Sequence, residues 1–304
     1  MYLRLFHTLC ALLIIVTMMG CDDNILTDVT AQPSYDLNAD DSFDMGVLLT
    51  GRTTSTQKLM LYNRNRGTIE LESLALRGGD SSLFRINVDG MAGVSFTNSD
   101  LLQIARGDSL YILLEASFHG TQSQRDVLRE DFIDIRCNGR TSSIRLTVTT
   151  RDVEELRADT IRCDTLWAEG GLDKLLYDAL VIPSGVTLSV GPGVNIYLHD
   201  HASIEVYGAL RLEGTAEQPV MLLGDRTDKL FDNLYYRDMS AQWGGIHLHP
   251  GSSGSLFDHA EIRGMTSGIR VEQEATDLRV LDGQPDFMTD DYQQLIIRNS
   301  LIMN

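Results

Sequence analysis

The sequence predicts an all-β protein in which an N-terminal β-sandwich is followed by a parallel β-helix, a solenoid of short strands. Three observations support this fold class. The chain has 304 residues, enough for about two domains. Alternating apolar runs separated by glycine and asparagine fill residues 36–150. Beyond residue 161 the runs become shorter and recur with a period in the low twenties.

The first element, residues 1–20, has the pattern of a secretion signal. Arg4 precedes an apolar run of eleven residues from Leu9 to Met19, which is too short to span a bilayer. The run closes on Met-Met-Gly followed by Cys21, and this closure resembles a bacterial lipobox with Met at the two outer positions. The resemblance implies cleavage before Cys21 and lipidation of that residue, which would anchor the chain to a membrane. The alternative is an ordinary cleaved signal that happens to end before a cysteine.

Residues 21–35 are expected to form a tether, because they are largely polar and contain Pro33. Asp22 and Asp23 resemble the surface-export signal of lipoproteins from Bacteroides-like bacteria. In enterobacteria an Asp beside the cysteine instead retains a lipoprotein at the inner membrane. A resemblance carried by residues 161–304, described below, favours surface export over retention at the inner membrane. We therefore expect a lipid-anchored, surface-exposed protein of the outer membrane.

The charge of the chain bears on its partners. The formal net charge is −18, and it becomes −19 once Arg4 leaves with the signal. Phosphate groups repel an acidic protein, so nucleic acid is not an expected partner. No sequence pattern calls for a cofactor.

Residues 36–150 form the predicted sandwich. Alternating runs predict strands at 58–62, 69–76, 109–116, 132–136 and 143–148, and Asn138-Gly139 predicts a hairpin turn. The order of the segments Phe43–Gly46, Leu59–Asn63 and Gly107–Leu113 resembles immunoglobulin-like domains of the abnormal-spindle and major-sperm-protein type. That resemblance implies a spacer or an adhesive module.

Two cysteines remain after Cys10 leaves with the signal and Cys21 is lipidated. Cys137 and Cys163 could form one disulfide between the end of the first domain and the start of the second, or remain two free thiols. The sequence leaves both alternatives open.

Residues 151–160 are charged and predict a connector, and residues 161–304 predict the β-helix. Leu188 and Leu210 are 22 residues apart, and Ile246 and Ile269 are 23 apart, as expected for stacked coils. The segments that carry a further resemblance are Gly185–Gly193, Val206–Val220, Gln242–Ile246 and Ala260–Ile262.

Together these segments resemble the right-handed parallel β-helix lipoproteins of Bacteroides-like bacteria. The resemblance implies an exported cell-surface protein without implying a shared activity, because the fold hosts lyases, hydrolases and adhesins. The run 294–304 looks like the beginning of another coil, so the β-helix is expected to be incomplete.

Candidate site residues fall in three places. His247 and His249 would point to one face of a strand, where they would either share a metal or form outward polar rungs.

Two long interruptions of the solenoid carry aromatic and charged residues suited to sugar stacking and hydroxyl binding; these are Tyr235, Tyr236, Arg237 and Asp238 in the first, and Phe287 and Tyr292 in the second. Alternatively, these loops cover a coil face with their aromatic residues packed inward. Trp243 is expected to be a packing residue.

No catalytic set is recognisable in the sequence. The leading hypothesis is a surface lipoprotein with a non-enzymatic role in binding, adhesion or display toward a glycan or a protein. The alternative is a carbohydrate-active enzyme, a polysaccharide lyase or a glycoside hydrolase, on a β-helix scaffold.

Overall fold

A computed structural model describes residues 25–37, 41–97, 102–122, 124–231, 234–272 and 294–303. The chain divides into two compact units. The first unit runs to Met45 and adds Thr53–Phe118 and Leu128–Val148; the second contains Gly46–Arg52, His119–Val127 and the chain from Thr149 onward. The described residues are strands and turns with two short 3-10 turns, η1 (Gly79–Ser81) and η3 (Tyr236–Asp238), and no α-helix. The prediction of an all-β protein is therefore confirmed.

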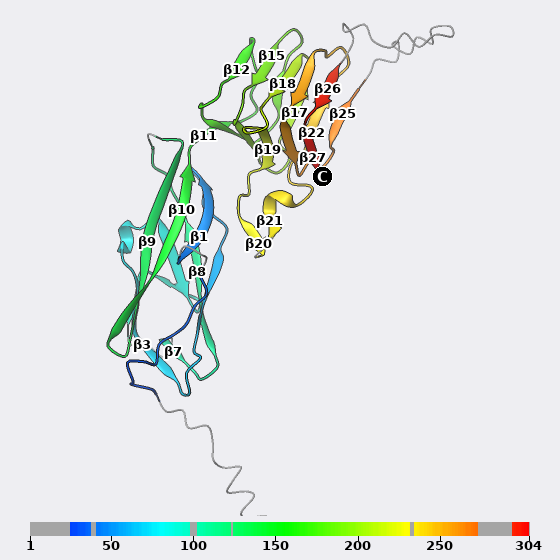
Figure 1. Ribbon diagram of the computed structural model, residues 1–304. Coiled ribbons are helices and arrows are strands. Elements are labelled where there is room, and N and C mark those ends of the chain that lie inside the picture. The colour runs from blue at the N-terminus through cyan, green and yellow to red at the C-terminus, as the bar shows by residue number, and fades with distance from the viewer. Residues whose placement is uncertain are drawn as a thin grey trace, which may run out of the picture. The chain divides into compact units, whose positions relative to one another are not determined.

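The first unit is built on two sheets (Figure 1). One sheet has the order β1 (Ser42–Leu49), β10 (Arg140–Arg151), β9 (Asp126–Cys137), β3 (Ile69–Leu76) and β6 (Ser95–Thr97), with β7 (Gln103–Ile104) also beside β3. The other is antiparallel, in the order β2 (Gln57–Tyr62), β8 (Ser109–Ala116), β4 (Phe84–Val88) and β5 (Met91–Gly93).

Sequence alternation explains how these strands bury one face. Along β8 every second residue is buried, from Leu110 through Ile112 and Leu114 to Ala116. The predicted turn is confirmed, because Asn138 and Gly139 have φ of 49° and 75° between β9 and β10.

The expected tether is only partly correct, because residues 25–35 pack on the first unit. The Leu26 amide donates to the carbonyl of Thr68 at 2.8 Å, and Ser34 and Tyr62 exchange backbone hydrogen bonds. Ala31 is buried. The polar composition of this segment concealed these pairings, which are made by its backbone. Cys21 and the signal lie outside the described residues.

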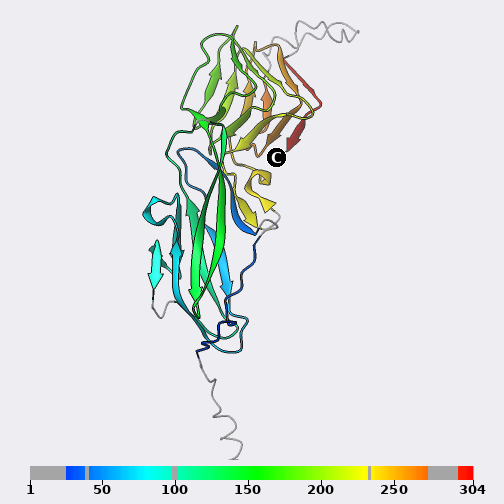
Figure 2. The same cartoon turned by 60° about the vertical axis from the view of Figure 1, so that its left-hand side comes forward.

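The second unit contains three parallel sheets, which the chain visits in turn (Figures 1 and 2). The first is β11 (Val153–Leu156), β13 (Asp173–Leu176), β16 (Asn195–Leu198), β19 (Val220–Gly224), β24 (Ala260–Arg263) and β27 (Leu301–Met303). The second is β14 (Leu180–Ile182), β17 (Ser203–Val206), β22 (Gly245–Leu248) and β25 (Ile269–Val271). The third is β12 (Thr165–Trp167), β15 (Thr187–Val190), β18 (Ala209–Glu213), β23 (Ser255–Asp258) and β26 (Leu295–Arg298).

The register of these sheets confirms the predicted repeat. Leu188 pairs with Leu210 in the third sheet, and Ile246 pairs with Ile269 in the second. Each coil therefore places its apolar residues directly over those of the coil before it, an arrangement consistent with a β-helix.

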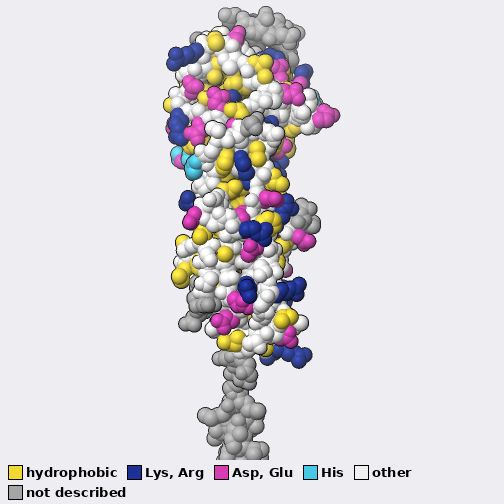
Figure 3. All heavy atoms as spheres, turned by 90° about the vertical axis from the view of Figure 1, so that its left-hand side faces the viewer, with side chains coloured by type: hydrophobic (Ala, Val, Ile, Leu, Met, Phe, Trp, Pro, Cys, Tyr) yellow, Lys and Arg dark blue, Asp and Glu magenta, His cyan; other side chains and the backbone are white. Residues whose placement is uncertain are grey.

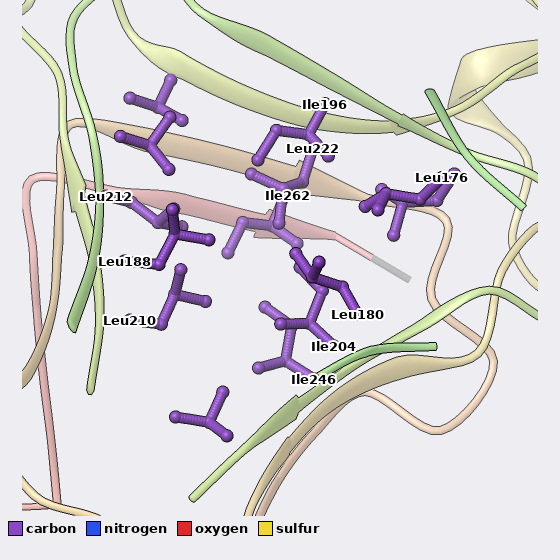
Figure 4. Close-up of a cluster of buried hydrophobic side chains, with 14 of the residues drawn as sticks. Leu176, Leu180, Leu188, Ile196, Ile204, Leu210, Leu212, Leu222, Ile246 and Ile262 are labelled. Atoms are coloured by element: carbon purple, nitrogen blue, oxygen red, sulfur yellow. The ribbon is translucent and has the colours of Figure 1, made fainter. Parts of the chain in front are cut away.

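Apolar side chains from all three sheets meet in one core (Figure 4). Ile196, Leu222 and Ile262 stack from the first sheet, while Ile204 and Ile246 stack from the second. Trp243 is fully buried in this core and its indole N–H donates to the carbonyl of Arg263 at 2.7 Å, which confirms its packing role.

Glycine is required where coils approach closely. A Cβ on Gly208 would lie 2.1 Å from the Val186 carbonyl oxygen, so no other residue fits that corner without displacing the backbone.

The expected connector needs correction. The segment 151–160 is not only a connector, because it contains β11, whose residues pair with β13 as the first strand of a parallel sheet. Cys137 and Cys163 are both free thiols in this structure, which agrees with the second of the two alternatives. Cys137 is buried, and burial together with the nearby charge of Glu72 raises the pKa of its thiol to about 11.

Candidate functional site

The outward face of the second parallel sheet gathers polar side chains from three coils. In β17 and β22, Ile204, Val206, Ile246 and Leu248 point into the core and are fully buried. Strand alternation turns the residues between them outward, and the register places Glu205 beside His247. We call Glu205, His247, His249, Ser203, Ser267 and Tyr207 the polar cluster.

The carboxylate of Glu205 is the centre of this cluster. Its Oε1 accepts from the Ser203 hydroxyl at 2.6 Å and lies 3.0 Å from His247 Nδ1. Its Oε2 lies 2.7 Å from His249 Nε2 and 3.3 Å from His247 Nδ1. An ionised carboxylate only accepts hydrogen bonds, so both facing imidazole nitrogens are assigned as N–H donors.

These contacts decide the charge state of Glu205. Burial raises the pKa of the Glu205 carboxyl, but hydrogen bonds from Ser203 and His249 and the charges of His247 and His249 outweigh burial and leave that pKa below its ordinary value. The side chain of Glu205 is 20% exposed, as is that of His249. The Glu205 carboxylate is therefore ionised at a position that is only partly exposed to solvent.

Ser267 extends the cluster beyond His247. The Nε2 atom of His247 lies 3.1 Å from Ser267 Oγ, on the opposite side of the ring from Glu205. Ser267 Oγ also lies 2.6 Å from the carbonyl oxygen of Gly244. Gly245 makes room for this hydroxyl, because a Cβ there would lie 2.6 Å from Ser267 Oγ. Ser267 itself is exposed.

His249 supplies an aromatic surface to the same cluster. Its ring stacks on that of Tyr207. Tyr207 is 42% exposed to solvent. Glu272 lies 3.9 Å from the other nitrogen of His249. An aromatic edge, a carboxylate and two imidazoles therefore meet on one face.

His247 and His249 do share one partner, as their spacing predicts, but that partner is the Glu205 carboxylate. Across the described residues, no group of three or more His, Cys, Asp or Glu side chains is arranged to hold a metal ion. The alternative interpretation, outward polar rungs, matches the observed hydrogen bonds.

The first interrupting loop is held largely by contacts within itself and to β24. The Arg226 guanidinium lies 3.7 Å from the ring centroid of Tyr236, and Arg237 lies 4.8 Å from that of Tyr235. Asp238 pairs with Arg263 at 2.9 Å. These contacts favour the loop as a cover for a coil face. Phe287 and Tyr292 lie outside the described residues.

The other histidine pair is divided between two environments in the second unit. His199 Nδ1 lies 2.8 Å from the buried carboxylate of Asp225, which also pairs with Arg52. His201 is almost fully exposed. The two histidines therefore do not form one site.

Sequence reasoning missed Glu205, Ser267 and Tyr207. The insertion after β19 places Glu205 and His247 42 residues apart, about twice the regular coil spacing, so a constant period does not align them. The alternation Ser203-Ile-Glu205 beside the His-x-His strand is the signal that could have found the pair.

On the face of the molecule shown in Figure 3, acidic and basic side chains are scattered among apolar and uncharged ones. In the part of the chain that the structure describes, we find no helical segment that could span a bilayer.

Comparisons with known proteins identify no family for this chain. No protein family matches the sequence, and no curated protein matches it. Among solved structures, a Vibrio cholerae VesB protease aligns over 41% of this chain and 33% of its own, with 15% identity and a TM-score of 0.26. A family 123 glycoside hydrolase from Clostridium perfringens aligns over 40% of this chain and 26% of its own, with 9% identity and a TM-score of 0.27. Structural similarities with TM-scores this low give no information about function.

Proposed function

We propose that the protein is a lipoprotein, anchored through Cys21 to the outer membrane and displayed at the cell surface, that binds a glycan or a surface protein. In this proposal the two sheets of the first unit form an immunoglobulin-like sandwich that acts as a spacer. The three parallel sheets form a right-handed β-helix that presents the binding face. The alternating sequence and the coil register support this arrangement.

The observation that carries the binding role is the polar cluster on the second sheet. A carboxylate and two imidazoles offer hydrogen-bond partners for hydroxyl or amide groups, and the exposed edge of Tyr207 offers apolar contact. Binding sites combine apolar surface with a few convergent polar groups in this way. The rigid coils below hold these groups in fixed positions, which lowers the entropy cost of binding.

A glycan array probed with the chain from residue 22 onward tests this function. The same protein is assayed on each bound saccharide for new reducing ends and for unsaturated products. Binding without cleavage of glycosidic bonds supports the proposal. Cleavage would contradict it and support the carbohydrate-active enzyme instead.

A further inference from the structure

We propose that Ser267 is the nucleophile of an acyl-transfer site in which His247 is the general base and Glu205 orients the imidazole. The substrate class is a carboxylic ester. This activity goes beyond the proposed binding role and does not depend on it.

The proposal rests first on geometry. Ser267 Oγ lies 3.1 Å from His247 Nε2, and His247 Nδ1 lies 3.0 Å from Glu205 Oε1. A nucleophile within hydrogen-bond reach of a base, with that base held by a third group, is the arrangement shared by convergent serine hydrolases on unrelated folds. The order of the three residues along the chain is immaterial to that chemistry.

Glu205 determines the tautomer of His247, and with it which ring nitrogen presents a lone pair to Ser267. Ser203 and His249 both hydrogen-bond to this carboxylate, which favours its ionised form. The ionised group can only accept, so in the neutral ring the proton resides on Nδ1 and the lone pair on Nε2. That lone pair points at Ser267, as a general base requires.

Ser267 has two acceptors for its single hydroxyl proton. The carbonyl oxygen of Gly244 lies at 2.6 Å and His247 Nε2 at 3.1 Å. Rotation about the Cβ–Oγ bond moves the hydrogen from one acceptor to the other without moving a heavy atom. The serine is exposed, so a substrate can reach Oγ from solvent.

The reaction balances without a further co-reactant. Ser267 Oγ bonds to the ester carbonyl carbon while its proton passes to His247 Nε2. The ester C–O bond then breaks, and the departing alkoxide takes that proton and leaves as the alcohol. Water, deprotonated by His247, attacks the acyl-serine; the carboxylic acid leaves and the proton returns to Ser267 Oγ.

A fluorophosphonate probe tests the proposal on the purified full chain, with the modified serine identified by peptide mass spectrometry. We expect labelling at Ser267, complete loss of that label in Ser267→Ala, and at least a tenfold slower reaction in His247→Gln. Ser253→Ala is the matched control, because Ser253 is also an exposed serine of the second unit. Its substitution should leave the label at Ser267 unchanged.

Two results would overturn the proposal. One is a wild-type chain that carries no label at Ser267, a result that needs no variant and so does not depend on variant folding. The other is a folded His247→Gln protein, as judged by its circular dichroism spectrum, that labels at the wild-type rate. The rate of 4-nitrophenyl acetate hydrolysis should be unchanged in Ser253→Ala, lower in His247→Gln and lost in Ser267→Ala. A hydrolysis rate that is unchanged in Ser267→Ala would likewise contradict the assignment.

Discussion

His249 lies flat on Tyr207, with ring centroids 4.1 Å apart and ring planes 5° from parallel. The parallel register explains the contact. Val206 pairs with Leu248, so the residues that follow them leave neighbouring strands at the same level. Glu205 anchors the other end of the imidazole through Nε2, so one histidine joins the aromatic and acidic parts of the polar cluster.

Tyr207→Ala should lower the free energy of unfolding by about 1 kcal/mol, because aromatic pairs contribute ~0.5–1.5 kcal/mol beyond the area that they bury. Urea unfolding followed by circular dichroism measures this change. Tyr207→Phe keeps the stacked ring and is the matched control. Equal losses in the two variants would show that the stack contributes nothing.

Glu205 should make the stability of the second unit depend on pH. Its folded-state pKa is lowered, so the unfolded chain takes up this proton first as pH falls. The stabilisation that ionised Glu205 gives the folded protein is complete above the ordinary glutamate pKa of about 4.3. It is lost as pH falls through the lower pKa that Glu205 has in the folded protein. Urea midpoints measured from pH 6 down to pH 3 should fall less steeply in Glu205→Gln than in the wild type. The exposed Glu217→Gln is the control and should retain the wild-type slope.

Much of the fold could be predicted from the sequence, because alternation directly records which side of a strand is buried. The expected strand at 69–76 matches β3, and those at 132–136 and 143–148 lie within β9 and β10. Strand β11 was missed because Glu154 and Glu155 make its outward positions read as a charged linker, while its pairing with β13 is made by the backbone.

The candidate site was harder to predict, because it depends on residues brought together across coils. His247 and His249 could be recognised by their spacing, but their partner Glu205 lies one coil away and its sequence distance includes the inserted loop. Ser267 comes from the turn before β25 and reaches His247 only because Gly245 has no side chain. A contact of this kind between neighbouring coils cannot be predicted from a local sequence motif.

The two cysteines should differ sharply in reactivity. The thiolate is the reacting form, and burial raises the pKa of Cys137 to about 11, while Cys163 is exposed. At pH 8, Ellman's reagent should modify Cys163 rapidly in the native protein and Cys137 only after unfolding. Cys163→Ser should remove the fast phase. A fast phase that persists in this variant would contradict the burial of Cys137.

Trp243 should be the most costly single truncation in the parallel unit. Its side chain is fully buried and its indole N–H is paired, so Trp243→Ala leaves both a cavity and an unpaired carbonyl at Arg263. Loss of a buried large aromatic residue costs about 3–5 kcal/mol. Leu166→Ala, at a position that is 64% exposed, is the control and should change the urea midpoint little.

Lipidation of Cys21 should hold the protein in the membrane, because several acyl chains on one residue give stable anchoring. Cys21→Ala should move the protein to the soluble fraction and remove the acyl mass from its N-terminal peptide. Unchanged fractionation and mass would reject the lipid anchor.

The proposed binding role requires that the polar cluster on the second parallel sheet contacts the ligand. The most direct test measures binding to the array-selected ligand by surface plasmon resonance for Glu205→Gln, Tyr207→Ala and the loop variant Tyr236→Ala. We predict at least a tenfold loss of affinity for the first two and wild-type affinity for the third. Wild-type affinity in both cluster variants, with binding lost in Tyr236→Ala, would show that the ligand contacts the interrupting loop and not the polar cluster.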